Sequence, residues 1–98
     1  MAIIAFDVDG TLETYSGKPR WEVIDLLRCF HALEHRIIVW SGGGKSYAEQ
    51  KVRELKLGEF VDSCHDKRMS AKEPGEPVFA DIAFDDEFVQ LAEVNIKV

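Results

Sequence analysis

The chain has 98 residues, enough for one domain with a single core but too few for a catalytic domain with a separate lid. The composition, 46% hydrophobic and 31% charged, excludes a disordered chain and a fibrous repeat. A formal net charge of −6 disfavours a protein that holds nucleic acid mainly through a basic surface, because Lys and Arg neutralise the phosphates in such complexes.

We expect residues 1–98 to form one domain. No charged-then-apolar leader opens the sequence, and no segment approaches the roughly 20 apolar residues that a membrane-spanning helix needs. The sequence therefore predicts a cytoplasmic protein that has no membrane partner.

The first half of the sequence alternates between strand and helix patterns. The apolar residues 2–6 predict a buried strand, and the turn-forming residues within 13–19 predict a loop. Residues 20–35 repeat apolar side chains at spacings of three, four and seven, which is typical of a helix packed on a sheet. Residues 36–40 are rich in β-branched side chains and lead into a glycine-rich turn, which indicates a second buried strand.

The second half continues this alternation. A helix is expected over residues 46–57, with Gly58 at the left-handed position that ends it. We predict further strands at 60–64, 82–84 and 94–98, an irregular surface loop over 65–78, and a turn or short helix over 87–91.

This order of elements predicts the fold class α/β, as a small Rossmann-like three-layer domain with a mostly parallel sheet. Right-handed crossovers place the carboxyl ends of parallel strands at one edge of the sheet, where open α/β folds build their sites. Asp7, Ser41 and Asp85 each stand at the end of a predicted strand. We therefore expect them to converge although they are far apart in the sequence.

Two carboxylates, Asp7 and Asp9, follow the first strand within the segment Asp-Val-Asp-Gly-Thr-Leu, residues 7–12. Carboxylates this close repel each other unless they share a cation or a proton, so the pair predicts a bound metal ion. A carboxylate at such a position can also attack an electrophile covalently. A polar turn would account for Asp9 and Gly10 but would leave Asp7 unexplained.

This segment resembles the first motif of the haloacid dehalogenase-like (HAD) phosphohydrolases. The resemblance implies that Asp7 is the nucleophile, which forms an aspartyl phosphate, and that Asp9 protonates the leaving oxygen and then activates water. Gly10 and Thr11 are expected beside the substrate phosphate, with a sharp backbone turn at Gly10 and the Thr11 hydroxyl holding Asp9. Dehalogenase chemistry is disfavoured, because family members of that kind lack the acid at the position of Asp9.

Ser41 resembles the second motif of the family, a lone Ser or Thr after an apolar strand. It would donate a hydrogen bond to a phosphoryl oxygen, and Gly42 and the amides after it would add donors. Taken alone, Ser41 is equally well explained as a helix-capping or turn serine. Residues 44–46, Gly-Lys-Ser, do not form a Walker A loop, because Val39 occupies the position of its first glycine.

The third motif of the family is a lysine that balances the negative charge of nucleophile and phosphate. Lys72 lies close to a proline, as the family lysine usually does, although Glu73 interrupts the pair. Lys67 is the second candidate. We therefore predict Lys72 as the catalytic lysine and keep Lys67 as the alternative.

Asp85 and Asp86 follow the predicted strand 82–84 and resemble the fourth motif, which completes a Mg²⁺ shell. Mg²⁺ prefers near-octahedral oxygen ligands and keeps several waters. The resemblance implies as ligands the Asp7 carboxylate, the backbone carbonyl of Asp9 and Asp85, with Asp86 acting through water. The alternative for this acidic run is the start of a helix, favoured by the helix dipole.

The four motifs occur in order, and only a short loop separates the first motif from the next helix, as in capless members of the family. The resemblance implies a Mg²⁺-dependent phosphohydrolase acting on a phosphate monoester, with an open site suited to large or macromolecular substrates. The motifs are also similar to those of the phosphatase domain of polynucleotide kinase-phosphatase, so a nucleic-acid end is one candidate substrate. A homo-oligomer or a partner protein could complete the site. The alternative function is a HAD-fold binding or regulatory module with little or no turnover.

Overall fold

The structure is a computed structural model that describes residues 1–67 and 80–98. Its elements, in chain order, are β1 (Ile3–Asp7), α1 (Trp21–Ala32), β2 (Arg36–Ser41), α2 (Lys45–Glu54), β3 (Ser63–Asp66), β4 (Ala80–Asp85) and β5 (Ala92–Lys97). Strands and helices alternate as predicted from β1 to β3. Most of the irregular loop predicted over 65–78 lies outside the described residues.

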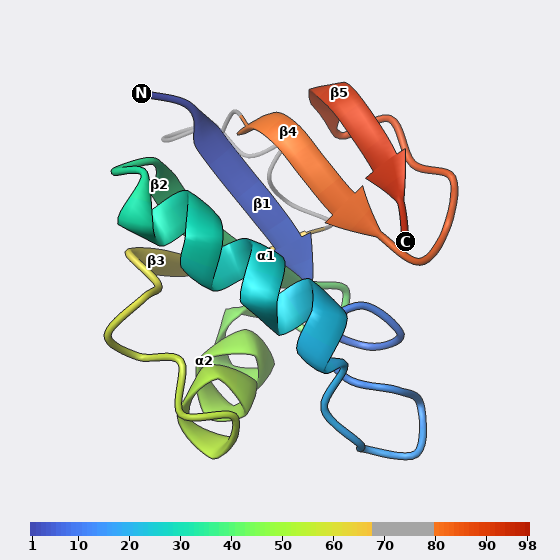
Figure 1. The fold of residues 1–98 in the computed structure, drawn as a ribbon. Helices are drawn as coiled ribbons and strands as arrows, with labels where there is room; N and C mark the ends of the chain where they lie inside the picture. The colour runs from blue at the N-terminus through green and yellow to red at the C-terminus, as the bar shows by residue number, and fades with distance from the viewer. Residues whose placement is uncertain (68–79) are drawn as a thin grey trace.

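All five strands are parallel and lie in the order β3-β2-β1-β4-β5 (Figure 1). β1 is the central strand, with β2 on one side and β4 on the other. The chain proceeds outward from β1 to β3 and resumes at β4 on the other side of β1, so the strand order reverses beside β1. The predicted α/β, Rossmann-like arrangement is confirmed, and within residues 1–67 and 80–98 every strand pair of the sheet is parallel.

Both described helices contribute to one core cluster on the same face of the sheet, so the third layer of the predicted arrangement stays a prediction. α1 packs against β2, and α2 packs against β2 and β3. The crossovers from β1 to β2 and from β2 to β3 step in the same direction along the sheet, and right-handed connections then place both helices on one side. Residues 86–91, which connect β4 to β5, form no helix.

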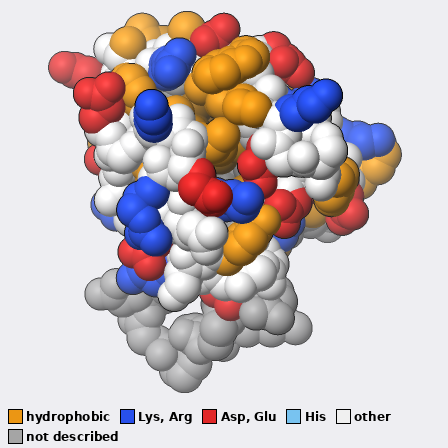
Figure 2. Space-filling model, turned by 90° about the horizontal axis from the view of Figure 1, so that it is seen from below, with side chains coloured by type: hydrophobic (Ala, Val, Ile, Leu, Met, Phe, Trp, Pro, Cys, Tyr) orange, Lys and Arg blue, Asp and Glu red, His pale blue; other side chains and the backbone are white. Residues whose placement is uncertain are grey.

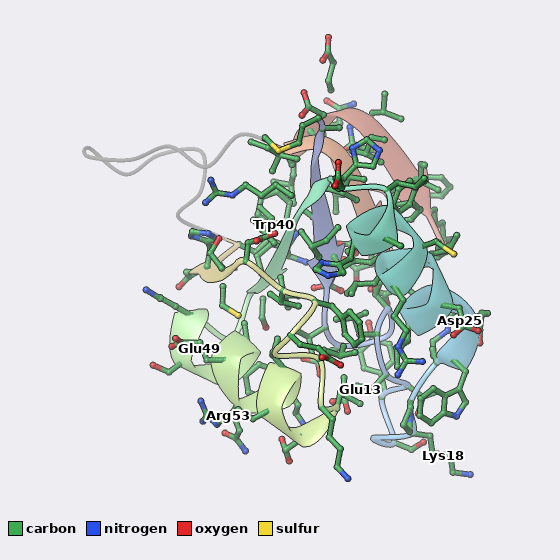
Figure 3. The ribbon with its side chains drawn as sticks, turned by 60° about the vertical axis from the view of Figure 1, so that its left-hand side comes forward. Glu13, Lys18, Asp25, Trp40, Glu49 and Arg53 are labelled. Atoms are coloured by element: carbon green, nitrogen blue, oxygen red, sulfur yellow. The ribbon has the colours of Figure 1, made fainter. Side chains whose placement is uncertain are left out.

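The main core lies between the helices and the sheet. Its fully buried side chains come chiefly from β1, α1 and β2 and include Ile4, Phe6, Ile24, Leu27, Ile37 and Val39. Phe6 and Phe84 stack with their ring centroids 4.9 Å apart and connect β1 to β4. A smaller cluster, which includes Ala5 and Trp40, lies on the opposite face, and Figure 3 shows Trp40 on the side of the sheet away from α1. β1 is thus buried on both faces, which holds its carboxyl end in a defined place.

The helix ends differ from the prediction because two non-glycine residues adopt left-handed backbone conformations. α1 ends at Ala32, and Glu34 follows it with a φ of 67°. α2 ends at Glu54, and the left-handed residue after it is Lys56, with a φ of 58°, where the sequence had predicted Gly58. Neither helix in the described part of the chain has the length and apolar character to span a membrane. The cytoplasmic location stays a prediction.

β3 begins three residues later than predicted. The apolar residues Phe60 and Val61 indicated a strand, but they pack against the core from the segment that precedes it. β3 pairs with β2 so that Asp66 lies beside Ser41, which places Lys67 just beyond the edge where the strands end. By contrast, β4 and β5 each begin two residues earlier than the strands predicted at 82–84 and 94–98.

The packing of α1 predicts unequal effects of removing two leucines. Leu27 is fully buried against the sheet, whereas Leu33, just after the helix, is 67% exposed. We expect Leu27→Ala to lower the free energy of unfolding by about 2–5 kcal/mol, because the lost methyl groups leave a cavity. Leu33→Ala should change it by less than about 0.5 kcal/mol. Urea unfolding measures both, and equal losses would contradict the orientation of α1.

Candidate active site

The carboxyl ends of the parallel strands meet at one edge of the sheet. Figure 2 views the molecule from this side and shows a basic side chain among several acidic ones near the middle of the face. An open cleft of about 260 Å³ lies here, and its lining includes Asp7, Asp9, Ser41, Gly42, Lys67 and Asp86. The structure thus brings together residues of the first, second and fourth predicted motifs, together with Lys67.

Asp7 ends β1 and is only 4% exposed. The Thr11 hydroxyl donates to its Oδ2 at 3.2 Å, and Lys67 Nζ lies 3.1 Å from its Oδ1. The prediction that Thr11 holds Asp9 is therefore wrong. The Val8 carbonyl accepts from the amides of Thr11 and Leu12, and this tight turn brings the buried Thr11 back beneath Asp7.

Asp85 ends β4 and is 1% exposed. Its Oδ2 lies 3.0 Å from Lys67 Nζ, and its Oδ1 accepts a hydrogen bond from the Glu87 amide at 3.0 Å. The Lys67 ammonium, supplied from the end of β3, therefore contacts the carboxylates that end β1 and β4. Two ion pairs of Lys67 therefore connect the ends of β1, β3 and β4.

Of the two candidate lysines, only Lys67 lies within the described residues, and Lys72 lies outside them. Lys67 lies between Asp7 and Asp85, where a charge-balancing lysine is needed. The sequence had placed Lys67 near the end of the third strand and kept it as the alternative, and the pairing of β3 with β2 locates it just beyond the strand ends.

Asp7, Asp85 and Asp86 form a group that could hold a metal ion, since one carboxylate oxygen from each lies within 4.8 Å of the others. All these ligands are carboxylate oxygens, which suit a hard divalent cation such as Mg²⁺ and lack the nitrogen or sulfur that zinc sites use. The Asp9 carboxylate does not belong to this group. The predicted role of its backbone carbonyl as a metal ligand stays a prediction.

The pKa values reflect the burial of this cluster. The pKa of Asp7 is raised from 3.8 to about 7, first by burial and then by the nearby charge of Asp85, while Lys67 opposes the rise. For Lys67, burial lowers the pKa, but the hydrogen bond to Asp85 and the charge of Asp7 outweigh burial and raise it above its ordinary value. For Asp86, burial raises the pKa, yet hydrogen bonds from Tyr15 and Asp7 lower it overall. The pKa of Asp7 is therefore raised while that of Asp86 is lowered, although both carboxyl groups line the same cleft.

Asp9 is oriented by a residue that the sequence did not single out. The Tyr47 hydroxyl, from the first turn of α2, donates to Asp9 Oδ1 at 2.7 Å, and this hydrogen bond raises the pKa of Tyr47 to about 12. A Cβ at Gly43 would lie 3.1 Å from the Tyr47 ring, so a side chain there would crowd it. The only sequence signal was an aromatic residue placed one turn after the glycine-rich segment, and 38 residues separate it from Asp9.

Gly10 makes the sharp turn that was predicted, with a φ of +82°. A Cβ at this position would collide with the Asp86 carboxylate and would lie 2.8 Å from the Tyr15 ring. The Tyr15 hydroxyl donates to Asp86, and Arg20 Nη1 donates to the Gly10 carbonyl at 2.7 Å. Gly10 therefore lets the chain pass close beneath Asp86, and Tyr15 is a second cleft residue that the sequence did not reveal.

Ser41 ends β2, and its side chain is buried beside the cleft. Its Oγ accepts a hydrogen bond from the Gly43 amide at 3.0 Å, which makes it a turn-stabilising serine in this structure. Gly42 lines the cleft, and a Cβ there would meet nothing within 4 Å. The interpretation of Ser41 as a turn residue is supported.

A larger hollow, of about 820 Å³, lies at the opposite edge of the sheet and is lined in part by His31, His35 and Arg36. His35 Nδ1 accepts a hydrogen bond from the Ala2 amide, which gives this histidine a structural role. We place the candidate site at the smaller cleft because the buried charges and the possible metal ligands lie there. Comparisons with models of protein families, with curated proteins and with solved structures give no match.

The raised pKa of Asp7 predicts how the stability of the metal-free protein depends on pH. The folded protein keeps a proton on Asp7 that the unfolded chain releases between about pH 4 and about pH 7. The contribution of Asp7 to the free energy of unfolding should therefore fall as the pH rises through this window. Urea unfolding of wild type and Asp7→Asn in the presence of EDTA measures the difference between them. A difference that stays constant or grows in favour of wild type with rising pH would contradict the assignment.

Proposed function

We propose that this protein is a Mg²⁺-dependent phosphohydrolase of the HAD-like, capless type, which hydrolyses a phosphate monoester through an aspartyl-phosphate intermediate. The observation that carries the proposal is the contact of one ammonium, Lys67, with the buried carboxylates of Asp7 and Asp85, beside a third carboxylate, Asp86. This arrangement joins a nucleophile, a charge-balancing cation and a set of oxygen ligands for a metal in one open cleft.

Asp7 carries the covalent step. One of its carboxylate oxygens attacks the phosphorus atom, and the new oxygen–phosphorus bond forms as the bond to the leaving oxygen breaks. Asp9 gives its proton to that leaving oxygen. Water then transfers a proton to Asp9 and attacks the phosphorus, which releases inorganic phosphate and restores the Asp7 carboxylate.

The orientation of Asp9 supports this division of roles. Tyr47 holds Asp9 Oδ1 from α2, whereas Thr11 and Lys67 hold Asp7. Asp9 lies outside the acidic group that could hold a metal, so its side chain is available for proton transfer. Two carboxylates two residues apart thus have different partners, as a nucleophile and an acid-base group require.

The proposed metal would be held by Asp7 and Asp85, with Asp86 nearby. When bound, Mg²⁺ would neutralise charge on the phosphoryl oxygens and help to hold the phosphorus atom beside the Asp7 carboxylate. We propose Lys67 as the lysine that offsets the charge of Asp7 and of the phosphate, in place of Lys72. Ser41 and the amides near Gly42 are the proposed donors to the remaining phosphoryl oxygens.

The proposed substrate class is a large phosphorylated molecule. Residues 8–20 connect β1 to α1 and residues 42–44 connect β2 to α2, so neither connection carries an additional domain over the cleft. A cleft that carries no additional domain from these two connections would admit a phosphate at the end of a macromolecule, including a nucleic-acid end.

Phosphate release in the presence of Mg²⁺ tests the proposed function. We expect the wild-type protein to hydrolyse an aryl phosphate, EDTA to abolish the activity, and Asp7→Asn to reduce it by at least about a thousandfold, because the amide is a poor nucleophile. A panel that includes 3′-phosphorylated oligonucleotides would identify the preferred substrate. Activity that survives in Asp7→Asn would contradict the mechanism. Absence of both turnover and an Asp7-dependent fluoroberyllate adduct would favour the binding or regulatory module instead.

Lys67→Met and Lys72→Met distinguish the two candidate lysines. Both variants lose one positive charge and keep a long side chain, so each is the control for the other. We expect Lys67→Met to lower kcat by about a hundredfold or more, since the charge of Asp7 and phosphate is then unbalanced. Lys72→Met should stay within about threefold of wild type. The reverse order of effects would assign the role to Lys72.

A further inference from the structure

β5 lies at one end of the sheet (Figure 1), and within residues 1–67 and 80–98 no strand pairs with its outer side. The strand is exposed over most of its length. Its apolar residues Val94 and Ile96 remain 50% and 38% exposed. The outward N–H and C=O groups of an edge strand are a template for pairing with another strand.

The hydrogen-bonding pattern shows which residues of β5 face outward. The Val98 amide donates to the Asp85 carbonyl at 2.8 Å, and Asp85 is paired with Lys97. In a parallel ladder, alternate residues direct both backbone groups toward the same neighbour. The even-numbered residues of β5 therefore face β4, and Glu93, Asn95 and Lys97 direct their N–H and C=O groups outward.

The outward side of β5 is complementary to itself. In an antiparallel pair, residues that direct their backbone groups outward must lie opposite one another. When Asn95 lies opposite Asn95 of a second copy, Glu93 lies opposite Lys97 of that copy, and the same pair forms twice. The neighbouring registers place Glu93 or Lys97 opposite Asn95 and lose both charge pairs. In the favoured register, Val94 lies opposite Ile96 of the second copy.

The charges needed for this pairing are available. Among the described residues, neither Glu93 nor Lys97 takes part in an ion pair. Lys97 Nζ lies 4.6 Å from the centroid of the Phe88 ring, and both residues are exposed. The Asn95 side chain bonds back to Leu91 and Ala92, so its backbone alone would pair at the axis.

We infer that β5 is the contact surface for a second copy of this chain, with the two strands antiparallel about a two-fold axis at Asn95 and Glu93 of each copy opposite Lys97 of the other. The pairing joins two five-stranded sheets into one continuous sheet. Because one short strand from each copy takes part, the dimer is weak, with a Kd on the order of 10–100 μM. The inference is independent of the proposed phosphohydrolase activity.

Sedimentation equilibrium of the full chain over a range of concentrations tests the pairing. We expect Glu93→Lys and Lys97→Glu each to raise the Kd of the dimer about tenfold, since each places like charges opposite one another twice. The double variant, which exchanges the two charges, should return to within about threefold of wild type. Both positions are exposed, and circular dichroism checks that each variant is folded.

Asp25→Lys and Lys18→Glu are the matched controls, because they make the same changes of charge elsewhere. Figure 3 shows Asp25 on α1 and Lys18 in the loop before it. Neither should change the Kd by more than about twofold. A wild-type chain that stays monomeric up to about 1 mM overturns the inference. The inference is also overturned if neither single variant changes the Kd of the dimer, or if the double variant does not restore it.

Discussion

The contact of the Lys67 ammonium with two buried carboxylates is the interaction on which the site depends. Asp7 and Asp85 are almost fully removed from water, where two like charges would repel each other strongly without a cation between them. With Asp86, the cluster holds three carboxyl groups against one ammonium, which leaves two negative charges when all are ionised. A divalent cation would balance this excess. In the metal-free cluster, burial and then the charge of Asp85 raise the pKa of Asp7.

The parallel sheet makes this contact possible. β1 is buried on both faces, and its neighbours β2 and β4 end at the same edge. Asp7 and Ser41 therefore line one cleft from rigid strands, and Asp85 contacts Lys67 just beneath it. The loop after β1 is tied to α2 at two points. Tyr47 holds Asp9, and Lys51 forms an ion pair of 3.0 Å with the buried Glu13. Groups held by packed elements in this way stay oriented without a ligand.

The structural features that the sequence predicted correctly are those that depend on local patterns of residues. The apolar run before Asp7 and the β-branched run before Ser41 locate β1 and β2, and parallel strands then imply that their ends converge. The unpredicted parts depend on long-range geometry. The position of Lys67 depends on where β3 pairs with β2, and the hydrogen bond from Tyr47 to Asp9 depends on how α2 lies over the turn. Thr11 binds Asp7 because of a tight backbone turn, and no spacing of residue types encodes that choice. The placement of both helices on one face follows from the strand order, which the sequence does not state.

The central claim is that strand ends far apart in the sequence surround one divalent cation beside Lys67. Anomalous diffraction from crystals soaked in Mn²⁺, used in place of Mg²⁺, tests it most directly. The account predicts a single strong peak in the cleft, within coordination distance of carboxylate oxygens of both Asp7 and Asp85, with Lys67 still in contact with one of them. A cleft without a peak, or a peak that only one of these two carboxylates can reach, would contradict the account.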